Sequence, residues 1–333
     1  MLVLGIETSC DETAAAVVKD GKSILSSLVA SQIPFHQKFG GIVPEIASRK
    51  HLETITPLVR ETLELAGITV QDIQGIAVTQ GPGLVGSLLV GLSVAKAIAY
   101  VYGKPIVGVN HLEGHISAVF LEDPAPDFPF IALVVSGGHT SLYQALERGS
   151  YRLLGATRDD AAGEAFDKVA KLLNLGYPGG VIIDQLSGKG RVDAISFPRA
   201  MSSRPSFDFS FSGLKTAVLN YLLSRSSPPQ PHEIPDIAAS FQEAVVDVLL
   251  EKTFQAVERT DCTSVVVSGG VAANSRLRKM MKERGEKEGI AIFIPPLNLC
   301  TDNASMIAAA GNHYLEKGCT SPLTLNAVSR WPL

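Results

Sequence analysis

The sequence predicts an α/β protein with two duplicated lobes, each built on a mixed, mainly parallel sheet covered by helices. Strand-like apolar runs alternate with helical segments, which is the pattern of sheets with parallel strands. The same order of elements also occurs twice along the chain. A length of 333 residues, of which 46% are hydrophobic and 19% charged, suits a globular protein with two cores.

Each half opens with three consecutive strands. In the first half, the apolar residues 2–9 and 13–19 are joined by the turn SCDE, and a Lys-Asp-Gly turn leads into SILSSLVAS. The second half repeats this plan in FIALVVSGGHTSLYQALERGSYRLLGAT, where a Ser-Gly-Gly turn and a charged turn separate the strands. The chain therefore restarts near residue 128, and we expect lobes at residues 1–125 and 126–333.

Each half then continues as strand, glycine turn, helix, strand and helix. GIAVTQGPG, KPIVGVN and HLEGHISAVF in the first half correspond to SVVVSGGVA, IAIFIPP and TDNASMIAAAGNHY in the second. Two such copies predict a central cleft, and proteins with this plan commonly bind a nucleotide there. Two inserts, at about residues 32–52 and 175–235, interrupt the repeats, and we interpret them as lids or partner-facing surfaces.

The stretch from Gly83 to Gly103 is almost uncharged and long enough to span a bilayer. Lys96 interrupts it, glycines and serines recur in it, and it lies between two strand-like runs. We therefore expect a helix buried against a sheet and no membrane span. The chain opens on MLVLGIETS, which has the pattern of a strand rather than of a secretory or transit peptide, so we expect a cytoplasmic location.

Three residues could hold a metal ion. His111 and His115 in HLEGH are four positions apart, so a helix would present both imidazoles on one face. Asp302 opens the corresponding helix of the second half, where an aspartate can also serve as an N-cap. If the three meet, two histidines and one carboxylate with open positions suit iron(II) or zinc as a Lewis acid. A lone pair of this spacing can equally be two helix histidines with backbone partners, and Leu112 stands where the metalloprotease motif HExxH needs its glutamate.

Glycine turns and carboxylates form a second group of candidates. The turns are Ser136-Gly137-Gly138, Gly179-Gly180 and Ser268-Gly269-Gly270, all placed at expected strand ends, where glycine lets backbone amides approach a phosphate. Asp167 and Asp184 could each contact a sugar, or could be a solvated helix carboxylate and a cap residue. Asp11 and Glu12 in the opening turn could act near a transferred phosphate or metal, or could be turn residues. The Walker lysine motif is absent, which excludes a P-loop enzyme.

Ten motifs follow one another between residues 5 and 310: GIETSCDETA, GGIVPEIASRKH, GPGLVGSLLVG, NHLEGH, VVSGGHT, DDAAGEAFDKVAKLL, YPGG, FSFSGLKTAV, SGGVAANSRLR and CTDNASMIA. Together they resemble the TsaD/Gcp (YgjD) family. The resemblance implies an actin-like ATPase (ASKHA) fold and a tRNA adenosine threonylcarbamoyltransferase. Such an enzyme transfers the threonylcarbamoyl group from threonylcarbamoyl-AMP to the exocyclic amine of adenosine 37 in tRNAs that read codons beginning with A, and AMP leaves.

The resemblance also implies roles for individual residues. The metal ligands would be His111, His115 and Asp302, holding iron(II) or, alternatively, zinc. ATP, ADP or threonylcarbamoyl-AMP would be held by Val134, Val135, Ser136, Gly137, Gly138, Asp167, Gly180, Asp184 and Asn274. Asp11 or Glu12 would help with proton transfer or placement. The sequence departs from the family at Val181, where proline usually follows the two glycines.

The partners implied by the resemblance are tRNA, a TsaB-like paralogue, a TsaE-like ATPase and a TsaC-type synthase that supplies the adenylate. A net charge of −4 gives no overall electrostatic case for RNA binding, so RNA would bind locally or with help. One local candidate is the basic run from Arg276 to Lys287, which is otherwise a solvated helix face. A second cluster consists of Lys189, Arg191, Arg199, Arg204 and Lys215. The sequence leaves a homodimer open.

Two other functions stay open at this point. The chain could be a non-catalytic, actin-like scaffold subunit that binds a nucleotide and dimerises with a paralogue, although the intact HLEGH and TDN segments speak against this. It could also be a small-molecule carbamoyltransferase on the same fold. The acceptor, tRNA or a small amine, distinguishes that alternative from the main prediction.

Overall fold

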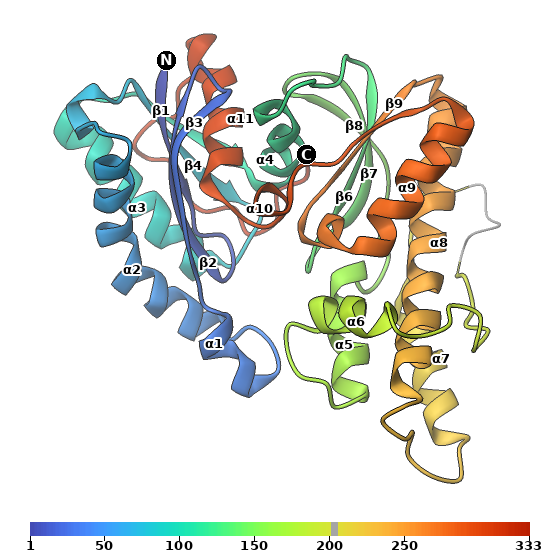
Figure 1. Ribbon diagram of the computed structural model, residues 1–333. Coiled ribbons are helices and arrows are strands. Elements are labelled where there is room, and N and C mark those ends of the chain that lie inside the picture. Colours follow the sequence, from blue (N-terminus) through green and yellow to red (C-terminus); the bar gives the residue numbers. More distant parts are fainter. Residues whose placement is uncertain (201–205) are drawn as a thin grey trace. The chain divides into compact units, whose positions relative to one another are not determined.

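The computed structural model describes residues 1–200 and 206–333, which form two compact units (Figure 1). Unit 1 combines Met1–Pro126 with Pro295–Leu333, and unit 2 is Asp127–Ile294. The expected boundary near residue 126 agrees with this division, but the expected second lobe wrongly included the last segment. The physical reason is helix α11 (Ala304–Glu316), whose apolar side chains Met306 and Ile307 are buried in the core of unit 1.

Unit 1 contains a five-stranded sheet in the order β3-β2-β1-β4-β5. Its strands are β1 (Leu2–Glu7), β2 (Glu12–Lys19), β3 (Ser23–Ser31), β4 (Gly75–Gly81) and β5 (Ile106–Asn110). The first three are antiparallel neighbours, whereas β1, β4 and β5 run parallel. The predicted meander and the two following parallel strands are therefore confirmed.

Helices cover both faces of this sheet because both faces carry apolar side chains. Leu4 and Ile6 of β1 pack with α2 (Pro44–Leu65) and α3 (Val85–Tyr102) on one face. Val3 points to the other face, where α11 lies against β1 and β4 (Figure 1). A Cβ on Gly5 would lie 2.2 Å from the Ala304 carbonyl oxygen, so the close approach of α11 requires glycine there.

The remaining short elements of unit 1 are α1 (Ile33–His36), α4 (His111–Ser117), α10 (Leu297–Cys300) and the 3-10 turns η1 (Gln37–Phe39), η2 (Val70–Asp72) and η3 (Ala118–Leu121). The first insert, expected at about residues 32–52, comprises α1, η1 and the first turns of α2. Because α2 packs on β2 and β3, only the part before Pro44 stands apart from the repeated plan.

Helix α3 is the predicted helix of the uncharged stretch. By length and composition alone, it is the one helix among residues 1–200 and 206–333 that could cross a membrane. Its inner face packs on β4 and α2, as expected for a helix set against a sheet. The expectation of full burial was wrong, however, because Val85, Leu89, Tyr100 and Val101 on the outer face are exposed.

Unit 2 repeats the sheet of unit 1. Its strands are β6 (Phe130–Val135), β7 (Thr140–Glu147), β8 (Ser150–Ala156), β9 (Ser264–Ser268) and β10 (Ala291–Phe293), in the order β10-β9-β6-β7-β8. Here too three strands form an antiparallel meander, and β6, β9 and β10 are parallel. The duplication predicted from the sequence is thus present strand by strand.

The helices of unit 2 are α5 (Ala162–Leu172), α6 (Gly179–Ser187), α7 (Ser212–Leu223), α8 (Ile234–Thr260), α9 (Ser275–Glu288) and the 3-10 turn η4 (Gly270–Ala273). Two expectations differ from the structure. Gly179 begins α6 instead of following a strand, and Asp184 lies within α6. The run Val181 to Ile183 has strand-like composition, but its preceding Tyr-Pro turn starts a helix that packs on α5 and α8.

Candidate functional site

Helix α4 presents His111 and His115 side by side. The helix begins directly after β5 because Asn110 caps it: the Leu112 amide donates a 2.9 Å hydrogen bond to the Asn110 side chain. Both histidines are buried, and their ring centroids lie 4.7 Å apart. The four-residue spacing therefore gives the shared face that the sequence predicted.

Asp302 completes the cluster from the start of α11. The cap of α11 is Asn303, whose side chain accepts a 3.0 Å hydrogen bond from the Met306 amide. Asp302 is therefore not the N-cap, which was its structural alternative. Its Oδ1 lies 3.1 Å from Nε2 of His115 and 3.6 Å from Nε2 of His111.

The cluster has the donor atoms that a metal ion needs. One ligand atom from each of the three residues lies within 4.8 Å of the others, on one side of the cluster. His115 is fully buried, yet neither of its ring nitrogens makes a hydrogen bond within the described residues, because its contact with Asp302 lacks suitable direction. A buried nitrogen without a hydrogen bond is costly, and a cation would satisfy it. The residues thus fit a metal with two imidazoles, one carboxylate and open positions.

Glu7 is a further residue of the site that sequence reasoning missed. It is completely buried at the end of β1, and its Oε2 lies 3.0 Å from Nδ1 of His111. Thr79 donates a 2.6 Å hydrogen bond to the same oxygen. Because Nδ1 faces Glu7, Nε2 of His111 faces Asp302, which is the arrangement in which a carboxylate orients a metal-binding histidine. A glutamate at the end of an otherwise apolar strand was the available signal.

Charges within this cluster shift the pKa values of its members. Burial would lower the pKa of His111, but the carboxylates of Asp302 and Glu7 outweigh it and raise that pKa to about 9. Burial would raise the pKa of Glu7, but the charge of His111 and the hydrogen bonds with His111 and Thr79 lower it. The cavity therefore attracts positive charge, as a cation site should.

Asp11 and Glu12 lie in the turn between β1 and β2. Asp11 is buried, and its carbonyl accepts a hydrogen bond from the Gln32 amide at 3.0 Å. Ser31 donates a 3.1 Å hydrogen bond to the Glu12 carboxylate. Burial, followed by the negative charges of Asp11 and Asp302, raises the pKa of Glu12 to about 10, so Glu12 carries a proton at neutral pH. The turn therefore offers a carboxylic acid near Asp302.

The glycine turns of unit 2 leave open space where side chains would be. A Cβ on Gly137, Gly138 or Gly270 would meet no atom within 4 Å. The turn after β6 is closed by two hydrogen bonds between Ser136 and His139. Such turns present backbone amides to a ligand without steric hindrance. Val134 and Val135 have fully buried side chains, so only their backbones could take part in binding.

The polar candidates of unit 2 tie these turns together. Asp167 accepts a 2.7 Å hydrogen bond from the Gly179 amide and so holds the start of α6, where Gly180 follows. Asp184 accepts hydrogen bonds from the Ser275 amide and hydroxyl at 3.0 and 2.8 Å. Ser275 directly follows Asn274, which caps α9 and donates a 2.7 Å hydrogen bond to Gln242. The candidates from α5, α6 and α9 therefore belong to one connected arrangement.

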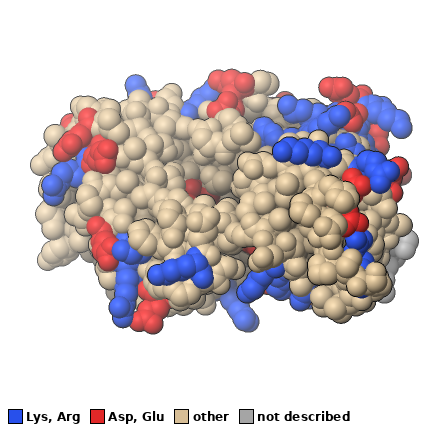
Figure 2. All heavy atoms as spheres, turned by 60° about the horizontal axis from the view of Figure 1, so that its bottom comes forward, with Lys and Arg blue, Asp and Glu red and all other residues tan. Residues whose placement is uncertain are grey.

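The basic clusters are largely engaged in ion pairs. On α9, Arg276 contacts Glu243 at 2.6 Å, and Arg284 contacts Glu251 and Glu288 at 3.3 and 2.8 Å. In the second cluster Arg191 and Arg199 pair with Asp236 and Asp247, and Arg204 lies outside the described residues. Figure 2 shows basic and acidic side chains interspersed on the face that it displays. These pairs favour the solvated-helix interpretation of α9 over an RNA surface.

Two sheets of one topology, together with two helix histidines facing a carboxylate, define a protein of actin-like ATPase fold with a candidate metal site. Among solved structures, HypF from T. kodakarensis matches 95% of this chain and 48% of its own, with a TM-score of 0.65 and 15% identity. Component A of (R)-2-hydroxyglutaryl-CoA dehydratase from Acidaminococcus fermentans matches 96% of this chain and 99% of its own, with a TM-score of 0.56 and 19% identity. At these identities, the likeness concerns the fold alone.

The chain belongs to the TsaD family, tRNA N6-adenosine threonylcarbamoyltransferase, whose model matches residues 23–309. The protein of that name from Syntrophus aciditrophicus is 59% identical over 333 residues, which are 100% of this chain and 98% of that protein. Its namesake from Syntrophotalea carbinolica is 56% identical over 100% of this chain and 97% of that protein. The family predicted from the ten motifs is therefore confirmed.

Proposed function

We propose that this protein transfers the threonylcarbamoyl group of threonylcarbamoyl-AMP to the exocyclic amine of the adenosine that follows the anticodon in tRNA. Membership of the TsaD family over the whole chain supports this assignment. The structural observation that carries it is the cluster of His111, His115 and Asp302. Neither the scaffold nor the small-molecule transferase is favoured by the relatives, which share one name.

The acceptor nitrogen attacks the carbamoyl carbon, the bond from that carbon to the phosphate oxygen breaks, and AMP leaves. Because the mixed anhydride has a good leaving group, the protein needs no nucleophile of its own. His111, His115 and Asp302 would hold iron(II) or zinc, and a bound metal would polarise the carbonyl as a Lewis acid. Glu7 would keep Nε2 of His111 directed at that position.

The adenylate would be held by unit 2. The backbone amides of Ser136, Gly137 and Gly138 would contact phosphate, and the open space at these glycines admits it. Asp167, Gly180, Asp184 and Asn274 would complete the site around the nucleoside. Val134 and Val135 would contribute through their backbones, since their side chains are buried. The resting ligand would be ATP, ADP or threonylcarbamoyl-AMP.

Asp11 and Glu12 would serve the reaction as acid groups. A proton must leave the attacking amine and reach a base or solvent. Asp11 lies next to Glu12, and the two carboxyl groups raise each other's cost of ionisation, so a proton is held between neighbouring acids. This pair would therefore accept or place a proton during transfer.

Protein partners would assist the reaction. Besides tRNA, we propose a TsaB-like paralogue, a TsaE-like ATPase and a TsaC-type synthase that supplies the adenylate, all in the cytoplasm. The outer face of α3 supports a protein contact, because Tyr100 and Val101 are 77% and 70% exposed there. The paired state of the basic residues on α9 also supports help in RNA binding.

The variant His111→Ala tests the proposal. We expect it to lose its metal and at least about a hundredfold of transfer activity, because the Lewis acid would be missing. The matched control is His232→Ala, which removes an exposed histidine outside the site and should change neither quantity. Metal content is measured by mass spectrometry and transfer by the release of AMP. Full transfer with full metal content in His111→Ala would contradict the proposal.

A further inference from the structure

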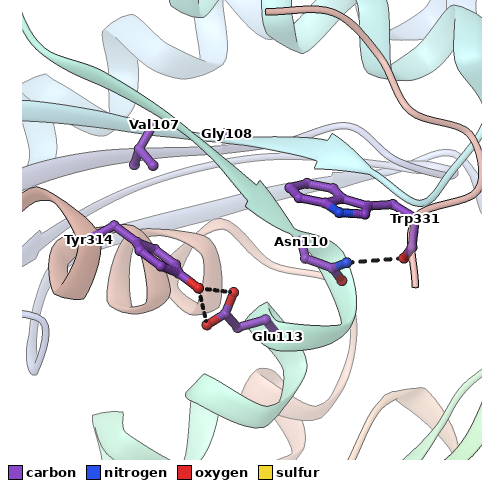
Figure 3. A pocket seen from close by; sticks show the side chains of 6 residues that line it. All are labelled: Val107, Gly108, Asn110, Glu113, Tyr314 and Trp331. Carbon is purple, nitrogen blue, oxygen red and sulfur yellow. Dashed lines mark hydrogen bonds between the residues drawn. The ribbon is translucent and has the colours of Figure 1, made fainter. Parts of the chain in front are cut away.

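Unit 1 contains a pocket of about 200 Å³ that is distinct from the metal ligands (Figure 3). Its lining includes Asn110 and Glu113 of the α4 region, Tyr314 of α11 and Trp331 near the end of the chain. Glu113 lies between the two candidate ligands in sequence. Positions two apart on a helix point in different directions, so its carboxylate meets Tyr314 and not the metal cluster.

The pocket has an acceptor group at its edge. Glu113 is only 4% exposed, and the Tyr314 hydroxyl lies 2.8 and 2.9 Å from its two oxygens. One hydroxyl donates one hydrogen bond at a time, whereas a carboxylate has about four acceptor positions. A ligand that brings N–H donors therefore suits this pocket, and a ligand that carries negative charge here does not.

The pocket also has an aromatic wall that is held in place. Figure 3 shows the rings of Trp331 and Tyr314 on opposite sides, with the Glu113 carboxylate beneath them. The Asn110 side chain donates a 3.1 Å hydrogen bond to the Trp331 carbonyl. Upstream in the same tail, the Gly83 amide donates to the Ser329 carbonyl at 3.3 Å. The indole is therefore positioned before any ligand arrives, which reduces the entropic cost of binding.

We propose that this pocket binds a single nucleobase that carries an exocyclic amino group, stacked on Trp331 and hydrogen-bonded to Glu113. Its volume of about 200 Å³ lies below the range of roughly 300–1,000 Å³ for drug-sized ligands, so a single ring system fits better than a whole cofactor. Indole faces stack on bases, and carboxylates accept hydrogen bonds from base amino groups. Guanine suits Glu113 best because its N1–H and amino donors are adjacent.

The base could come from RNA or from a free nucleotide. This inference rests on the proposed function in one respect: an acceptor tRNA offers unstacked loop bases, the form in which proteins usually recognise RNA. The exposed Arg330, directly before Trp331, adds a cation for the neighbouring phosphate. RNA is therefore the favoured source.

The fluorescence of Trp331 tests the proposal directly, because this residue is the only tryptophan among the 333 residues. The full-length protein is titrated separately with GMP, CMP, AMP, UMP and an anticodon stem-loop RNA. We expect saturable quenching by GMP and the RNA. UMP should bind at least about tenfold more weakly than GMP, because its single N–H lies between two carbonyl groups that face the carboxylate. Stronger quenching by the RNA than by GMP identifies RNA as the source, and equal quenching identifies a free nucleotide.

The variant Glu113→Gln separates this site from any other nucleotide site. It keeps the shape of the side chain but loses the charged acceptor, so GMP affinity should fall roughly tenfold or more. Glu122→Gln, an exposed carboxylate outside the pocket, is the control and should bind like the unaltered chain. Metal content and melting temperature show whether α4 is intact, and Trp331→Leu followed by calorimetry gives a second variant. Absence of quenching by every probe, or unchanged affinity in Glu113→Gln, overturns the proposal, whatever the transfer activity.

Discussion

Glu7 has the strongest influence on the candidate metal centre of any residue that is not itself a ligand. It is buried, it contacts Nδ1 of His111 at 3.0 Å, and it receives a second hydrogen bond from Thr79. We predict that Glu7→Gln weakens metal binding about ten- to hundredfold, because the amide orients the imidazole less firmly and adds no charge. Titration with iron(II) or zinc measures this, with Glu122→Gln as control. Equal metal affinity in the two variants would show that Glu7 has no such role.

Two adjacent glycines should respond differently to the same substitution. Gly269 has a φ of +92°, and its Cβ would lie 2.4 Å from the Val135 carbonyl oxygen. Gly269→Ala should therefore destabilise the fold, by about 1–3 kcal/mol. A Cβ on Gly270 meets no atom within 4 Å, so Gly270→Ala should fold normally yet bind adenylate more weakly. Melting curves and nucleotide titration measure the two effects. Normal nucleotide affinity in Gly270→Ala would exclude this turn from the binding site.

At the residue scale, the sequence predicted those contacts that follow from helix spacing and motif order. His111 and His115 needed only the helical repeat, and Asp302 needed the duplication. Glu7 was missed because its partner, His111, is distant in sequence and comes close only through the pairing of β1 with β4 and of β4 with β5. The hydrogen bond from Asp167 to Gly179 likewise depends on the packing of α5 with α6.

Among the elements, α3 offers a clear test of a partner surface. Val101 is 70% exposed on its outer face, and Leu223 on α7 is 72% exposed, so the same substitution can be compared at both positions. We predict that Val101→Glu folds with stability changed by less than about 0.5 kcal/mol, as is usual for surface positions, but no longer copurifies with a TsaB-like partner. Leu223→Glu should copurify normally. Loss of the complex in both variants, or in neither, would remove α3 from the interface.

Helix α7 depends on a charged anchor that should make its stability sensitive to acid. Asp159 accepts hydrogen bonds from the Phe211 and Ser212 amides at 2.8 and 3.2 Å. Burial would raise the pKa of Asp159, but hydrogen bonds from Ser210 and from these amides lower it below 3.8. The ionised anchor therefore stabilises the fold above the unfolded pKa, and this contribution disappears as the pH falls through the lower folded value.

We predict that Asp159→Asn costs about 1 kcal/mol or less at neutral pH, because the side chain is exposed. The difference from the unaltered chain should be constant above about pH 5 and should shrink below about pH 4. Urea unfolding at several pH values measures it. A difference that grows as the pH falls would contradict the assigned sign.

At the scale of elements, composition identified α3 but not its exposure. Its sequence is apolar on every side, so periodicity could not show which face meets the sheet. Strand-like composition also misplaced Asp184, because helix α6 forms through its packing on α5 and α8. Tertiary contacts decided both cases.

For the whole molecule, the duplicated plan was predictable and the path of the chain end was not. The order of strands in each sheet follows from two repeats of one motif series. The last segment, Pro295–Leu333, follows β10 of unit 2 and yet belongs to unit 1. Linear order suggested otherwise, and the buried face of α11 against β1 and β4 accounts for the result. This crossing is what brings Asp302 to His111 and His115.

The central claim is that tRNA accepts the threonylcarbamoyl group through the agency of this protein. The most direct measurement is mass analysis of tRNA nucleosides after incubation with threonine, bicarbonate, ATP and the proposed partners, with and without this protein. We predict that threonylcarbamoyladenosine forms only when the protein is present and that removal of its metal abolishes it. Equal formation without the protein, or transfer to a small amine instead of tRNA, would contradict the assignment.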